Sequence, residues 1–189
     1  MKKSVLVTFL LLSGAVVFGQ TWTLDKAHSK LGFSVTHLLV STVDGSFKSV
    51  DAKITSSKAD FTDAVFELTA DVNTIDTDNE QRDGHLKNAD FFDAAKFPSL
   101  TFKSTSIKKV ADKKFKLVGD LTLHGVTKSV TLDLTLGGTG VHPHTKKTIA
   151  GFKATGTLKR SDFGIGAGTP SSAVSDEVEL TANGEFSKD

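Results

Sequence analysis

KKFKLVGDLTLHGVTKSVTLDLTL, residues 113–136, is the stretch that decides the expected fold. Apolar and polar residues alternate along it on both sides of His124-Gly125. Successive side chains of a strand point to opposite faces, so this period of two predicts two half-buried antiparallel strands. Glycine adopts a positive φ without steric cost, so the pair at 124–125 predicts a tight hairpin between them.

The same alternation recurs along most of the chain. It is strong over 29–37, 65–72, 149–160 and 177–186, and weaker over 21–25, 43–54 and 100–107. In each strong run the apolar residues fall on one face, which indicates a sheet with one side against a core. About eight or nine short strands without a long helix predict an all-β protein, either a barrel or a sandwich.

One segment departs from this pattern: RDGHLKNADFFDAAKFPSLTFKS, residues 82–104, is rich in Phe and partly helical in character. A short helix is expected over 78–86, with Asp78 as its N-cap and Asn88 after its end. A second turn over 91–95 should stop before Pro98. A β-protein needs no apolar helical segment to close its sheet, so this insertion suggests a cover over an apolar cavity and hence a carried ligand.

The inward positions of the last two strands alternate between large and very small residues. The small ones are Ala150, Ala154, Gly156, Ala182 and Gly184. Such positions leave room inside a barrel for a ligand. They also occur where strands bend or approach closely. Both interpretations stay open on this pattern alone.

The first nineteen residues have the pattern of a secretory signal peptide. Lys2 and Lys3 precede an apolar run, and Val17 and Gly19 suit a signal peptidase site. The run is too short and interrupted to favour a membrane anchor. We therefore expect a cleaved signal peptide over 1–19, one domain over 20–189, and a periplasmic or secreted protein without stable membrane insertion.

Composition excludes several classes of function. Removing Lys2 and Lys3 from the 23 Lys and Arg residues leaves 21 against 22 Asp and Glu, a net charge of −1 without a basic block. This argues against nucleic acid or an anionic membrane surface as the main partner. The absence of Cys excludes disulfides and cysteine-based catalysis. Fourteen Phe, one Trp and no Tyr fit a dry interior, although biased composition would look the same.

Polar candidate residues have competing interpretations. Arg82 and His85 are three residues apart and could meet a polar head group at a pocket mouth, or could only anchor the helix. His28, His37 and His124 are expected to bond the backbone at strand corners, since no nucleophile-elbow pattern supports a triad. The His142-Pro143-His144 stretch predicts an exposed hairpin loop. We therefore expect neither a catalytic nor a metal site.

Four motifs in this order resemble the YceI family of exported, polyisoprenoid-binding proteins: WTLDKAHSKLGFSVTHL, RDGHLKNADFFDAAKFPSLTFKS, GDLTLHGVTKSVTL and LKRSDFGIG. The resemblance covers essentially the whole mature chain, although the HPHTKK loop departs from the family pattern. It implies a YceI-like domain over 20–189, a lipocalin-like extended antiparallel β-barrel of about eight strands with a short helical insertion. It further implies an apolar tunnel for a long-chain isoprenoid lipid or quinone, and makes a homodimer plausible.

Together, residues and resemblance predict a non-enzymatic carrier of a long-chain apolar small molecule, with no cofactor apart from the bound isoprenoid lipid or quinone. Two alternatives remain: an enzyme acting on such a lipid through His85 or His124, and a solidly packed structural or stress-response β-protein. The residues expected to contact the ligand are Phe33, Val35, Phe66, Leu68, Arg82, His85, Phe91, Phe92, Phe97, Phe102, Leu121, Leu123, Leu134, Phe152 and Leu180.

Overall fold

The computed structural model describes residues 19–189; the predicted signal peptide falls almost entirely on residues 1–18, which lie outside the described residues. The helical elements are α1 (Glu80–Leu86) and two 3₁₀ turns, η1 (Val72–Thr74) and η2 (Arg160–Phe163). The strands are β1 (Gln20–His37), β2 (Ser41–Phe47), β3 (Val50–Ser56), β4 (Val65–Asp71), β5 (Ile75–Asp76), β6 (Ser99–Ala111), β7 (Lys114–Leu123), β8 (Val126–Val141), β9 (Thr148–Lys159) and β10 (Glu177–Lys188).

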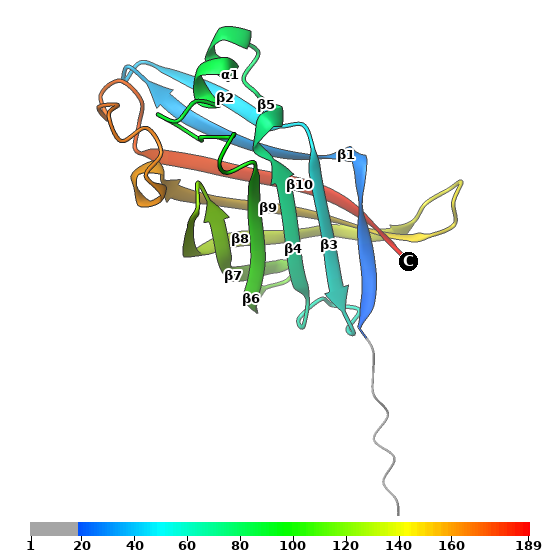
Figure 1. Ribbon diagram of the computed structural model, residues 1–189. Helices are drawn as coiled ribbons and strands as arrows, with labels where there is room; N and C mark the ends of the chain where they lie inside the picture. The colour runs from blue at the N-terminus through cyan, green and yellow to red at the C-terminus, as the bar shows by residue number, and fades with distance from the viewer. Residues whose placement is uncertain (1–18) are drawn as a thin grey trace, which may run out of the picture.

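Eight of these strands close into an antiparallel barrel (Figure 1). Their order is β1-β3-β4-β6-β7-β8-β9-β10, and β10 pairs with β1 to complete the ring. The hairpin at His124-Gly125 is as tight as predicted, because Leu123 pairs directly with Val126 and both turn residues have positive φ. The predicted fold class, an all-β antiparallel barrel with a short helix, is confirmed.

Strand β1 pairs with two different strands along one of its edges. Its first residues, 20–23, pair with β3, whereas residues 31–37 pair with β2. A bulge between Asp25 and Lys30 joins the two parts, so the predicted strands 21–25 and 29–37 are one strand. Conversely, the predicted strand 43–54 breaks after Phe47 into β2 and β3. The chain after β4 crosses to pair β5 with β2, and α1 lies above this end of the barrel (Figure 1).

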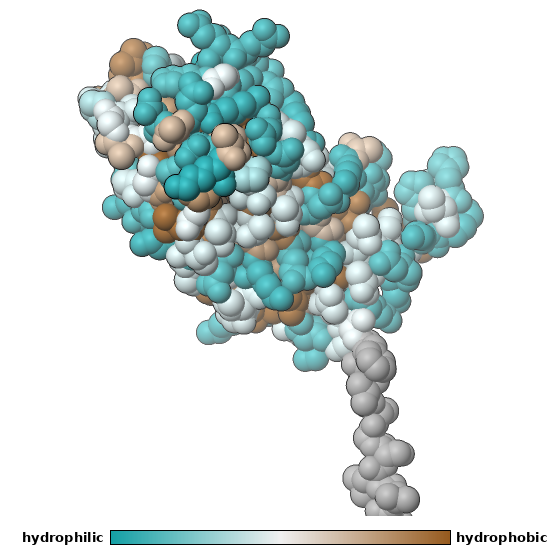
Figure 2. Space-filling view, viewed as in Figure 1, coloured by the Kyte–Doolittle hydropathy of each residue, from teal (hydrophilic) through white to brown (hydrophobic). Residues whose placement is uncertain are grey.

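The inward faces match the alternation in the sequence. In β7, residues 115, 117, 119, 121 and 123 are all buried, as expected of a strand with one face on the core. Polar residues predominate on the face of the molecule that Figure 2 shows. At the end away from α1, the ring of Phe61 packs against Trp22 and Phe152, with centroid distances of 5.2 and 5.0 Å. This end of the barrel is therefore plugged by its own side chains.

At the other end, one arginine organises the loop that follows η2. Arg160 is 6% exposed, and its guanidinium donates five hydrogen bonds to backbone carbonyls. The acceptors, at 2.6–3.2 Å, are the carbonyl oxygens of Ser175, Ile165, Gly166, Thr169 and Val174. A guanidinium has five N–H donors, so every one is used. The side chain thus fixes the backbone of residues 165–175 at the barrel rim.

We expect Arg160→Met to lower the free energy of unfolding by about 3 kcal/mol or more, since methionine fills similar space but leaves buried carbonyls without donors. Urea unfolding followed by the fluorescence of Trp22 measures this. The exposed neighbour provides the control: Lys159→Met should change stability by less than about 0.5 kcal/mol. Equal effects of the two substitutions would contradict the structural role of the guanidinium.

Candidate ligand-binding cavity

Two cavities lie inside the barrel, one behind the other. The inner cavity has a volume of about 130 Å³ and the outer cavity about 330 Å³. They share four wall residues: Phe47, Leu100, Leu121 and Leu180. We call these four the shared ring. Because the same side chains bound both spaces, the two cavities lie end to end with the shared ring between them, and we call the pair the tunnel.

The inner cavity is almost wholly apolar and owes its space partly to small residues. Ala154 of β9 and Ala182 of β10 pair with each other and line it. Gly156 does not provide room, because a Cβ there would meet the side chain of Leu132 at 2.6 Å. At Gly184 the space beside the backbone is likewise taken by Phe186. Both interpretations of the small residues therefore apply, each to different positions.

The outer cavity has apolar walls with polar groups at its α1 side. Arg82 lines it and donates from Nε to Thr77 Oγ1 (2.8 Å) and from Nη2 to the Thr77 carbonyl (2.6 Å). Asp83 accepts from the same threonine, so Thr77 anchors the helix to the chain that precedes it. The N-cap prediction was wrong by one residue: Asn79, not Asp78, accepts from the Arg82 amide.

His85 lies at the edge of this cavity. Its ring is exposed and makes an edge contact with Phe91, with 5.0 Å between centroids. Arg82 and His85 thus both line this cavity. Arg82 anchors α1 through a threonine rather than through a salt bridge, because its hydrogen-bond partners are both on Thr77.

The tunnel brings together fourteen of the fifteen residues that were expected to contact a ligand. Seven line the inner cavity: Phe66, Leu68, Phe102, Leu121, Leu134, Phe152 and Leu180. The outer cavity includes Phe33, Val35, Arg82, His85, Phe91, Phe92 and Leu123, together with Leu121 and Leu180. Both groups are spread along the chain, from residue 66 to 180 and from residue 33 to 180, and closure of the barrel brings the members of each together.

Phe97 was expected to contact a ligand, but the structure places it in the wall of neither cavity. Its ring contacts His124, with centroids 4.9 Å apart, and covers the backbone of Gly125. It therefore packs on the β7–β8 hairpin rather than over the cavity. The amide of Lys96 donates to the carbonyl of Asp93 (2.9 Å), and this turn directs Phe97 away from Phe91 and Phe92.

Several wall residues were missed by sequence reasoning. Phe47 packs against Phe33 and Phe92 (centroids 5.9 and 6.0 Å apart) and belongs to the shared ring. The alternation of Val43, Gly45 and Phe47 could have indicated this residue, but the prediction of a single strand over 43–54 concealed it. Arg160 carried no signal, because a lone arginine in LKRSDFG resembles a surface residue.

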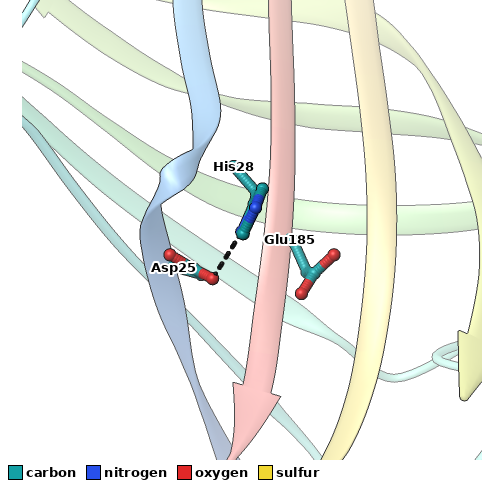
Figure 3. Close-up of side chains that lie close together, drawn as sticks. All are labelled: Asp25, His28 and Glu185. Carbon is teal, nitrogen blue, oxygen red and sulfur yellow. Dashed lines mark hydrogen bonds and ion pairs between the residues drawn. The ribbon is translucent and has the colours of Figure 1, made fainter. Parts of the chain in front are cut away.

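A second cluster of ionisable groups lies on the outside of the barrel, at the bulge of β1 (Figure 3). Asp25 pairs in register with Glu185 of β10, which places two carboxylates opposite each other. Like charges in this position repel. The Nδ1–H of His28 donates to Asp25 (2.8 Å), and donor atoms of all three residues lie within 4.8 Å of one another. The protonated imidazole can therefore offset the two carboxylates, and a divalent cation is a chemical alternative.

The remaining histidines have local roles. His124 donates from Nδ1 to the carbonyl of Phe163 (2.9 Å), which confirms the backbone bond expected at this corner. His144 is exposed in the loop between β8 and β9, as predicted. His37, by contrast, lines the outer cavity. Within residues 19–189, none of the helices has the length and apolar character to cross a bilayer.

Comparisons with known proteins agree with this architecture. Residues 22–186 match the family model described as YceI-like domain. The Protein YceI of Salmonella newport is 39% identical over 186 residues, covering 95% of both chains. The crystal structure of Burkholderia cenocepacia BcnA has a TM-score of 0.76 at 26% identity, covering 86% of this chain and 98% of that one. A polyisoprenoid binding domain from Saccharophagus degradans, 17% identical, shares the fold with a TM-score of 0.66 over 90% of this chain and 99% of that one.

We expect the pKa of His28 to lie above its ordinary value, because its hydrogen bond to Asp25, and then the negative charges of Asp25 and Glu185, favour the imidazolium. Its contribution to stability is therefore present at low pH and is lost as pH rises through the folded-state pKa. NMR titration of the His28 ring checks this. In Asp25→Asn the pKa should fall toward the ordinary value, and a titration unchanged by this substitution would contradict the assignment.

Proposed function

This chain belongs to the YceI-like family, and on that premise we propose that it binds and carries a long-chain isoprenoid lipid, such as a polyprenol or quinone, in its tunnel. The observation that carries the proposal is the polarity of this tunnel: it is closed at one end by aromatic rings and has polar groups at the other. An amphiphile with one long tail and one small head has the same asymmetry.

The inner cavity suits the tail. Its walls are aliphatic and aromatic, contributed by Leu68, Leu132, Leu134 and Phe152 among others. Removing apolar surface from water contributes about 25 cal/mol per Å². A polyprenyl tail therefore gains affinity along its whole length without polar contacts. Apolar cavities of this kind also stay dry, so a tail would displace little ordered water.

The mouth suits a head group that accepts hydrogen bonds. The described residues lining the outer cavity include Arg82, Arg160, His37 and His85, and no Asp or Glu. Arg160 uses all its donors on the rim backbone, which leaves Arg82, His85 and His37 as polar contacts for a ligand. A quinone carbonyl or a polyprenol oxygen fits donors of this kind.

The distant neighbour from Saccharophagus degradans is described as a polyisoprenoid binding domain, which supports the same ligand class. We further propose that the mature protein begins after residue 19 and works in the periplasm or outside the cell, without a catalytic activity. Of the two histidines considered for catalysis, His124 lies outside both cavities. The tunnel itself weighs against a solidly packed barrel.

Blocking the inner cavity tests the proposal. Ala154→Phe places a ring in a space of about 130 Å³ and should reduce uptake of added polyprenol or ubiquinone at least tenfold, because the ring occupies the path of the tail. Native mass spectrometry after incubation with the lipid measures the bound fraction.

The matched control is Lys153→Phe, which adds the same ring one residue earlier, on the exposed face of β9. It should bind lipid like the unmodified protein. Apoprotein without uptake of either lipid would overturn the proposed function. Equal uptake by Ala154→Phe and Lys153→Phe would show that a ligand, if bound, lies elsewhere.

A further inference from the structure

The turn between β1 and β2 exposes three consecutive large apolar side chains. Leu38, Leu39 and Val40 are 57%, 73% and 86% exposed. Single exposed apolar residues are ordinary on protein surfaces, but a contiguous group at a projecting tip marks an interaction site. Figure 2 shows hydrophobic surface at this corner of the molecule, at the upper left, where Figure 1 places the turn.

The backbone of this turn is unusual for its side chains. Leu38 and Leu39 have φ values of 52° and 60°, a region that Gly and Asn adopt far more readily than leucine. The amide of Leu38 donates to the carbonyl of Ala173 (2.9 Å), and that of Val40 to His37 (3.0 Å), which holds the turn in place. The conformation alone would be better served by asparagine or glycine. Backbone strain of this kind occurs at functional sites, where it is retained for a role other than stability.

Two segments, one at the turn and one beside it, contain no formally charged side chain. Residues 37–43 and 164–175 contain no Asp, Glu, Lys or Arg, although such residues make up 24% of the chain. A bridge between His37 and Val174 joins the two segments side by side. Two of the acidic residues beside these segments are held by hydroxyl groups, since Asp44 accepts from Ser34 and Asp176 from Ser161, whereas Asp90 and Asp162 are exposed at their edge. We call the two segments together the uncharged rim.

The uncharged rim is also the mouth of the tunnel. His37, Val43, Thr169 and Val174 belong to it and line the outer cavity. Leu38 directly follows His37, so the apolar tip continues from the cavity wall to the outside. A surface that touched the tip would therefore face the opening.

We infer that the uncharged rim docks on the surface of a lipid bilayer, with Leu38, Leu39 and Val40 among the lipids. This rests on the proposed function, since it gives the carried lipid a route between bilayer and tunnel that avoids water. An uncharged rim enters the interface without removing an ion from water, whereas its apolar tip gains from leaving water. A second copy is a poorer occupant, because a stable interface buries about 800 Å² on each partner and three aliphatic side chains fall well short of that.

Flotation with phosphatidylcholine vesicles tests the inference. The full mature chain should float with the vesicles, and raising the salt from about 0.05 to about 0.5 M should not release it, since no charge pair is involved. The triple variant Leu38→Asn, Leu39→Asn, Val40→Ser should lose at least tenfold of the vesicle-bound fraction. Its melting temperature should be unchanged or higher, because asparagine tolerates positive φ.

Val141→Ser is the control, since Val141 is 64% exposed at the end of β8, and the β8–β9 hairpin projects at the right of Figure 1, opposite the β1–β2 turn. It should float like the unmodified chain. Equal flotation of the triple variant, no flotation of the unmodified chain, or a dimer that the triple variant dissociates would each overturn the docking. Uptake of lipid from detergent separates the two proposals. The triple variant should still take up lipid in this assay. If no variant takes up lipid, the proposed function is overturned, while flotation still tests docking on the bilayer.

Discussion

The guanidinium of Arg160 determines where this barrel is open. A buried cation normally needs a carboxylate, but here five backbone carbonyls at 2.6–3.2 Å surround it. All five belong to residues 165–175, a stretch without regular strand structure that would otherwise have few ways to satisfy its backbone inside a protein. The rim loop is consequently folded around one side chain. Its edge pairs with His37 and leaves the outer cavity beside it.

The opposite end is closed by a different kind of interaction. Trp22, Phe61 and Phe152 meet there through ring contacts, and the buried Nε1–H of Trp22 has no hydrogen-bond partner among the described residues. One end is thus sealed by aromatic packing and the other is shaped by hydrogen bonds to the backbone. This difference gives the interior a direction, from a polar mouth to a dry end, and it arises from residues that lie far apart in the chain.

Most of the barrel could be predicted from the sequence, because a half-buried strand leaves a period of two that survives in Phe115, Leu117 and Leu121. The cavity walls followed from the same faces. What alternation does not record is where a chain turns: Phe97 lies five residues after Phe92 and yet packs on another hairpin. Alternation also does not indicate a lone buried cation such as Arg160, because its partners are backbone carbonyls, which every residue has. The break between β2 and β3 was missed although the alternation shifts phase there, from odd positions up to Phe47 to even positions from Val50 onward.

The shared ring of Phe47, Leu100, Leu121 and Leu180 divides the interior into two chambers of unequal size. A tail that stops at the ring leaves the inner chamber empty. The side chains that line this chamber then lack the dispersion contacts that a longer tail would provide. A longer tail would displace these side chains once and then fill the inner chamber. Affinity would therefore rise in a step at one number of isoprene units instead of growing evenly with each unit. The four core residues of the shared ring would therefore make binding selective for the length of the isoprenoid tail.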